Sequence, residues 1–157
     1  MKEQLAKHLK GGEAFQPIDH FLKEIPFEKL GIRPNGLPYS FYELFYHIAF
    51  AQKDILDFIV SDEYKTPQWP DDYWPENQAP KNEKEWQQLI SDYVVTRQEL
   101  IDLVQNENNE LSKPIKNGNG QTLHREILLV LEHNAYHTGQ LAMILRLLNI
   151  QPATPNS

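Results

Sequence analysis

Eleven prolines punctuate this chain, and their positions limit where long helices can form. Proline lacks a backbone N–H and clashes with the preceding helical turn, so it is rarely found inside a helix. Three long stretches contain no proline: residues 40–60, 82–105 and 122–149. Long helices are therefore expected in these stretches, with turns or loops between them.

The hydrophobic spacing within the three stretches is helical rather than alternating. In residues 40–60 and 82–105, apolar residues recur at intervals of three, four and seven, which places them on one face of a helix. Gln52 is a polar exception on that face of the first stretch. Residues 122–149 are apolar over more than half of the helix circumference, so this helix is expected at the centre of the fold.

Two of the boundaries carry recognisable capping residues. Ser40 and Glu43 fit a capping box, in which each side chain binds the backbone N–H of the other residue. Asn82 with Glu85 offers a second cap at the same spacing. These pairs predict that helices begin near residues 40 and 82.

The N-terminal segment carries a weaker helical signal. Its apolar stripe is interrupted by Gly11, Gly12 and Pro17, so one kinked or broken helix is predicted there. Four helical elements without a credible strand pair predict an all-α, four-helix bundle. At 157 residues, the chain is expected to form a single domain over 1–157.

The connection between the second and third predicted helices is unusually long. Residues 61–81 contain four prolines together with Trp69, Tyr73 and Trp74. Disordered linkers rarely carry so many aromatic residues, so an ordered crossover packed on the bundle is predicted. It either covers part of the core or forms a lid or wall over a site.

Charge and composition narrow the function classes. Fifteen Lys and Arg residues stand against 22 Asp and Glu residues, and the net charge of −7 argues against nucleic-acid binding through a basic face. The chain contains no cysteine, which excludes disulfides, thiolate metal sites and cysteine nucleophiles. No secretory signal and no run of 18 apolar residues is visible, so a cytoplasmic protein without membrane contact is expected.

Three of the six histidines form the strongest candidate site. His133 and His137 are four residues apart and lie on one helix face, directed towards the core. His47, on the helix at 40–60, would complete a set of three imidazoles with open coordination positions, as in catalytic zinc sites. The alternative is that His133 and His137 are core residues bonded to their neighbours. His124 faces the opposite side of its helix.

Other residues are candidates for a supporting role. A metal-bound imidazole usually donates its second N–H to a carboxylate or carbonyl, for which Glu43 and Gln140 are the candidates. The capping role is the more natural use of Glu43. His8 and His20 lie in the irregular first segment and are expected at the surface.

Three short motifs resemble the DinB-like (DinB/YfiT) superfamily. Residues 133–141, with the sequence His-Asn-Ala-Tyr-His-Thr-Gly-Gln-Leu, resemble its signature on the last helix. Residues 37–44 leading into His47 resemble its second helix, and residues 118–123 fit the segment before its last helix. The resemblance implies a four-helix bundle, often dimeric, in which His47, His133 and His137 hold a divalent metal, commonly zinc or nickel.

The resemblance leaves the reaction open. Some relatives look like transferases that use bacillithiol, mycothiol or glutathione, and others look like hydrolases, so fold alone does not name the activity. We favour a metal-dependent enzyme acting on a small molecule, with a low-molecular-weight thiol as cosubstrate if the reaction is thiol transfer. Trp69, Trp74 and Tyr136 are candidates for the pocket wall. The alternatives are a non-catalytic metal-binding or stress-related module and a metal-free interaction domain. A homodimer is a further expectation.

Overall fold

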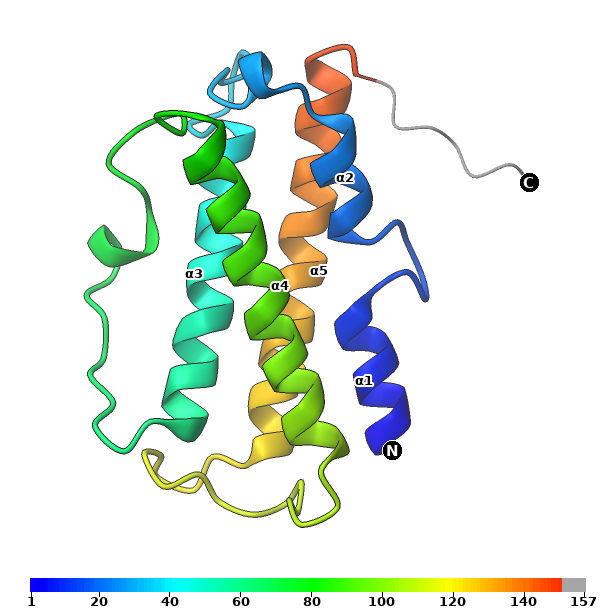
Figure 1. Ribbon diagram of the computed structural model, residues 1–157, viewed down its shortest axis with the longest axis vertical. Helices are drawn as coiled ribbons and strands as arrows, with labels where there is room; N and C mark the ends of the chain where they lie inside the picture. Colours follow the sequence, from blue (N-terminus) through cyan, green and yellow to red (C-terminus); the bar gives the residue numbers. More distant parts are fainter. Residues whose placement is uncertain (151–157) are drawn as a thin grey trace.

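A computed structural model describes residues 1–150 of the chain and contains five α-helices in this range (Figure 1). They are α1 (Lys2–Lys10), α2 (Ile18–Glu24), α3 (Phe41–Val60), α4 (Glu83–Gln105) and α5 (Leu123–Leu147). Two short 3₁₀ turns, η1 (Phe27–Lys29) and η2 (Asp71–Tyr73), lie in the connections. Within residues 1–150 the fold is all-α and has no strand.

Side-chain caps determine where the three long helices begin. The Ser40 hydroxyl accepts a hydrogen bond from the Glu43 backbone at 3.2 Å, and the Glu43 carboxylate accepts one from the Ser40 backbone at 2.7 Å. Asn82 caps α4 and Thr122 caps α5 by accepting a backbone N–H three residues later. Because caps satisfy orphan N–H groups, these helices begin directly after the capping residue.

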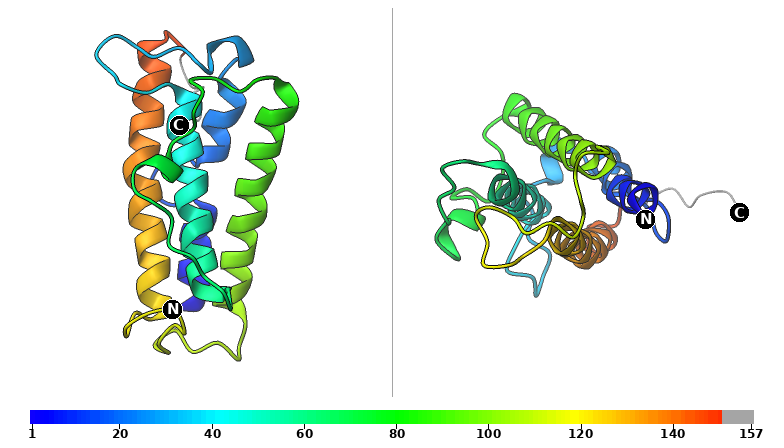
Figure 2. Two further views of the ribbon diagram at one scale, coloured as in Figure 1. Left: turned by 90° about the vertical axis from the view of Figure 1, so that its left-hand side faces the viewer. Right: turned by 90° about the horizontal axis from the view of Figure 1, so that it is seen from below.

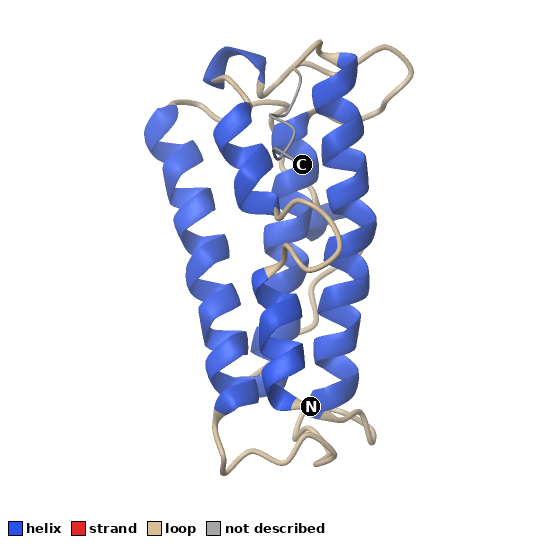
Figure 3. Cartoon of the chain, turned by 90° about the vertical axis from the view of Figure 1, so that its right-hand side faces the viewer, coloured by secondary structure: helices blue, strands red, loops and turns tan. Residues whose placement is uncertain are grey.

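The N-terminal segment forms two separate helices, so it is the broken rather than the kinked form of the predicted helix. Gly11 and Gly12 both have a positive φ, 80° and 88°, a conformation that ends α1 and that side chains other than glycine adopt poorly. Pro17 then precedes α2. The two short helices lie end to end along one side of the bundle, where they take the place of a single helix (Figure 3). The bundle thus has four positions filled by five helices.

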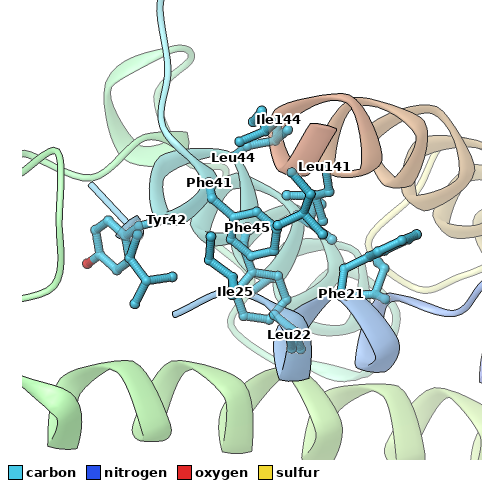
Figure 4. Packing of buried hydrophobic residues seen from close by; sticks show 14 of the residues in the cluster. Phe21, Leu22, Ile25, Phe41, Tyr42, Leu44, Phe45, Leu141 and Ile144 are labelled. Atoms are coloured by element: carbon cyan, nitrogen blue, oxygen red, sulfur yellow. The ribbon is translucent and has the colours of Figure 1, made fainter. Parts of the chain in front are cut away.

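The helices at the four positions surround a core built from two apolar clusters. The view along the bundle shows how these helices are arranged (Figure 2). The cluster that joins α2, α3, α4 and α5 contains the fully buried residues Phe41, Phe45, Leu141 and Ile144 (Figure 4). The second cluster joins α1, α3, α4 and α5 near the opposite end. Each such side chain stabilises the fold by about 1.5–3 kcal/mol through removal of apolar surface from water.

A polar layer separates the two clusters. Gln52, the polar exception on α3, is 1% exposed and donates a hydrogen bond to the Tyr93 carbonyl on α4 at 3.0 Å. Its side-chain oxygen accepts one from Asn134 on α5 at 3.1 Å. Buried amides cost free energy unless they are paired, so this chain of bonds sets the relative height of three helices.

The crossover between α3 and α4 runs along the outer side of α3 (Figure 2). Asp54 on α3 accepts hydrogen bonds from the hydroxyls of Tyr64 and Tyr73, at 2.8 and 2.5 Å. Further along, the Gln78 carbonyl accepts a hydrogen bond from the Ser40 hydroxyl at 2.7 Å. The crossover is thus attached at the start of α3 and again in the second half of that helix.

The outward side of α5 carries four large exposed apolar or aromatic residues: Leu128, Tyr136, Met143 and Leu147. The homodimer expected from the apolar coverage of this helix stays a prediction. No helix within residues 1–150 is long and apolar enough to span a lipid bilayer.

Candidate metal centre

Three histidine rings from two helices converge at one point of the bundle. His47 lies in the second turn of α3, and His133 and His137 lie near the middle of α5. The His47 ring centroid is 4.9 Å from that of His133 and 4.8 Å from that of His137, and the latter two are 4.5 Å apart. One ligand nitrogen from each ring lies within 4.8 Å of the other two.

Local sequence and helix packing each explain part of this convergence. A spacing of four residues places His133 and His137 one turn apart on the same face of α5. The packing of α3 against α5 then brings His47 opposite that pair. His47 is 4% exposed, while His133 and His137 are half-buried.

Hydrogen bonds determine which nitrogen carries no proton in the rings of His47 and His137. A carbonyl oxygen can only accept, so Nδ1 of His47, which is 3.3 Å from the Tyr73 carbonyl, carries the proton. Likewise Nδ1 of His137 donates to the Gln140 side-chain oxygen at 2.5 Å. In a neutral imidazole the second nitrogen is then unprotonated, so Nε2 of both rings can act as a ligand.

The distance between two of the ligand nitrogens suits a small cation. Two nitrogens that each lie 2.0–2.1 Å from one ion are separated by roughly 2.9–3.4 Å at ligand angles of about 90–110°. Nε2 of His47 and Nε2 of His133 are 3.0 Å apart. Because Nε2 of His47 is unprotonated, Nε2–H of His133 donates to it, and a cation would take the place of that one proton. The His47–His133 pair therefore has the separation that a shared divalent metal requires, and the donor chemistry of all three residues suits such an ion.

Burial keeps the three rings neutral. Burial first, and then the positive charge that His137 could carry, lower the pKa of both His47 and His133 to about 4. Burial also lowers the pKa of His137, against the opposing effect of the Gln140 hydrogen bond. Only a neutral imidazole binds a metal, so the site is in its ligand form at neutral pH.

Aromatic residues surround the three rings. The Trp74 ring stacks on the His47 ring at 4.4 Å with an angle of 4° between the planes. Trp69 approaches His47 edge-on at 6.1 Å, and Tyr136 approaches His137 edge-on at 4.9 Å. Trp74 is partly buried, whereas Trp69 and Tyr136 are 68% and 67% exposed. Trp74 thus supports a ring, and the other two present aromatic surface to solvent beside the rings.

The two residues considered for a supporting role differ in what they contact. Gln140 binds His137 directly. Glu43 is 6% exposed and serves the helix cap instead, where it also pairs with Arg33, whose Nε donates at 2.8 Å. Burial, which opposes ionisation, is outweighed by the hydrogen bonds from Arg33 and Ser40, so the pKa of Glu43 is lowered. As an ion-paired cap, Glu43 is not available as a base at the histidines.

The remaining histidines lie outside the cluster, and one of them is not where it was expected. His8 is exposed and His124 is half-buried on another part of α5. His20 was expected at the surface, but it is half-buried and its ring packs edge-on against Phe21 at 5.6 Å. Its Nε2 is buried without a hydrogen-bond partner. The reason is that α2 lies along the bundle and directs the His20 side chain towards it.

Two supporting residues were missed by sequence reasoning. The backbone carbonyl of Tyr73 binds His47, and Asp54 binds the hydroxyl of the same tyrosine. A backbone carbonyl leaves no signal in the sequence. The available hint was that Asp54 follows His47 by seven residues, which is two helical turns along the same face.

The fold and the site together define an all-α bundle protein with a three-histidine cluster between two of its long helices. A family model described as the DinB superfamily matches residues 13–141, so the chain belongs to that superfamily. This confirms the resemblance seen in the three short motifs. Comparison with curated proteins and with solved structures found no match.

Proposed function

We propose that this protein binds one divalent metal ion through His47, His133 and His137 and uses it to catalyse a reaction of a small molecule. The observation that carries the proposal is the convergence of three neutral imidazoles whose ligand nitrogens lie within 4.8 Å of one another. Within residues 1–150, no aspartate, glutamate or further histidine joins this group. Three protein ligands with open positions are typical of catalytic sites, whereas structural zinc sites have four.

The chain's own residues would prepare and bound the reaction site. A bound divalent ion would lower the pKa of a water or thiol and polarise an electrophile. Gln140 and the Tyr73 carbonyl orient two of the ligand rings. Trp69 and Tyr136 offer exposed aromatic surface to the apolar part of a substrate.

Thiol transfer and hydrolysis are the two reaction classes that we propose. In thiol transfer the nucleophile must come from a low-molecular-weight thiol, because the chain has no cysteine. Zinc and nickel are the metals that we propose first, since imidazole nitrogen suits both.

Elemental analysis of the purified protein after metal loading tests the binding step. We expect about one zinc or nickel per chain in the wild type and strong loss in His47→Ala, His133→Ala and His137→Ala. His124→Ala is the matched control, because it removes a histidine of α5 outside the cluster and should keep the metal. Absence of stoichiometric metal from the wild type, or equal loss in the control, would contradict the proposal.

Assays of the metal-loaded protein test the catalytic step. Small electrophiles are supplied with bacillithiol, mycothiol or glutathione, and ester and amide substrates are supplied without thiol. We expect turnover that requires the metal and falls in Trp69→Ala or Tyr136→Ala without loss of metal. Stoichiometric metal with no turnover on any of these substrates would instead favour the non-catalytic metal-binding alternative.

A further inference from the structure

We propose that Tyr73, held in place by Asp54, is a positioning residue that orients His47 for metal binding. This inference rests on the proposed function, since it assigns a role towards the ion that His47 would bind. It follows from the contacts between η2 and α3, in which both the backbone carbonyl and the side-chain hydroxyl of Tyr73 take part. The crossover between α3 and α4 would then be a working part of the metal centre as well as a connection.

Tyr73 contacts three successive turns of α3. Its backbone carbonyl accepts the Nδ1–H of His47 at 3.3 Å, and its hydroxyl donates to Asp54 at 2.5 Å. Between these two points its ring packs edge-on against Phe50 with the centroids 4.9 Å apart. His47, Phe50 and Asp54 share one face of the helix, so a single residue lying along that face reaches all three.

The turn that carries this carbonyl is closed by its own hydrogen bonds. The backbone N–H of Gln68 donates to the Asp72 carboxylate at 2.7 Å, and the N–H of Asp72 donates to the Gln68 carbonyl at 3.0 Å. The N–H of Tyr73 donates to the Pro70 carbonyl at 3.0 Å. These bonds hold the turn together, and the bond from Tyr73 to Asp54 attaches the turn to α3.

The attachment limits both the tautomer and the rotation of the His47 ring. The Tyr73 carbonyl keeps the proton on Nδ1 and leaves Nε2 for the metal. Trp74, the next residue, stacks on one face of the ring and is itself stacked on Tyr39 at 5.9 Å. Partners of this kind, one step removed from the metal, typically change metal affinity by about 10–100-fold when they are lost.

Tyr64 provides a matched control for the test. Its hydroxyl also donates to Asp54, at 2.8 Å, but no hydrogen bond connects it to the three histidines. Tyr73→Phe and Tyr64→Phe therefore each remove one hydroxyl bond to the same carboxylate. We expect Tyr73→Phe to weaken binding of Zn²⁺ or Ni²⁺ by about tenfold, and Tyr64→Phe by less than twofold. Both variants should melt at similar temperatures when metal-free. Tyr73→Trp, which keeps an aromatic ring but lacks the hydroxyl, should bind metal more weakly than the wild type.

A measurement without metal separates this inference from the proposed function. Nitrogen-15 NMR of the histidine rings in the metal-free protein should show His47 protonated at Nδ1 in the wild type and in Tyr64→Phe. In Tyr73→Phe it should show a mixture of tautomers. If the wild type takes up no metal but these spectra are obtained, the positioning by Tyr73 stands and the proposed function fails.

Two results would overturn the inference itself. One is an equal change in metal affinity for Tyr73→Phe and Tyr64→Phe, which would show that only the general attachment of the crossover matters. The other is a wild-type His47 ring protonated at Nε2 in the metal-free protein, because the Tyr73 carbonyl would then not be setting the tautomer.

Discussion

Metal binding by the three histidines should persist into acidic solution. Protons and metal ions compete for the same nitrogens, so affinity falls once the imidazoles become charged. An ordinary histidine with a pKa of about 6.5 is roughly one-tenth neutral at pH 5.5. Three such residues together would reduce the apparent affinity by about a thousandfold between pH 7.5 and pH 5.5.

The structure predicts a much smaller loss. Burial, with a further contribution from His137, lowers the pKa of His47 and His133 to about 4, so both rings are almost wholly neutral at pH 5.5. The pKa of His137 is also lowered by burial, so its loss is smaller than that of one ordinary histidine. The total change between pH 7.5 and pH 5.5 should therefore be less than about tenfold.

Competition with a chelator calibrated at each pH measures this change with Zn²⁺ or Ni²⁺. Trp74→Ala is the informative variant, because it exposes the His47 ring and should return the pKa of that histidine towards 6.5. Its ratio of affinities between pH 7.5 and pH 5.5 should exceed the wild-type ratio by up to about tenfold. The reasoning is refuted if the wild type loses a hundredfold or more while its circular dichroism at pH 5.5 is unchanged.

The same pKa values predict how the metal-free protein responds to acid. Between about pH 6.5 and pH 4 the unfolded chain binds protons at His47 and His133 that the folded chain does not bind. The contribution of these two histidines to the free energy of unfolding should therefore be greatest above pH 6.5, and it should decrease as the pH falls through this window. Urea unfolding at several pH values measures the slope, and His47→Gln should make it shallower.

Three further predictions concern other parts of the molecule. Gln140→Leu removes the acceptor for His137 and should weaken metal binding by about tenfold in chelator competition. Leu100→Ala empties a fully buried position in the cluster remote from the histidines. It should reduce the free energy of unfolding by roughly 3 kcal/mol, which lowers the melting temperature by about 9 °C. Metal affinity measured by calorimetry should not change. Arg97→Met breaks the bond to Asp19 that joins α4 to α2, and because Asp19 is partly solvated the loss in urea unfolding should be only about 1–2 kcal/mol.

Much of the helical architecture could be predicted from short-range patterns. Proline positions, apolar spacing and the caps at Ser40 and Asn82 locate α3 and α4 within one residue of their observed starts. The N-terminal break could be foreseen from Gly11, Gly12 and Pro17, but not that it yields two separate helices in line. That outcome depends on how each short helix packs against α4 and α5.

The candidate site divides in the same way between local and tertiary information. The pairing of His133 and His137 depends only on helix geometry, and the sequence determined it alone. His47, by contrast, was placed from the sequence only on the helix at 40–60, and that position does not explain an exposure of only 4%. The crossover buries it, since Trp74 covers one face of the ring and Tyr73 binds its edge.

Sequence alone thus determined the three long helices, the caps at Ser40 and Asn82, and the i, i+4 pair, because each depends on interactions within a few residues. Tertiary structure decided that α3 faces α5 with His47 opposite that pair, and that the crossover returns along the side of α3. It also decided that Asp54 supports the turn carrying Tyr73. The physical reason is that these contacts join residues far apart in the chain or use backbone atoms. These long-range contacts can form only once the core clusters and the buried Gln52 bonds have set the relative heights of the helices.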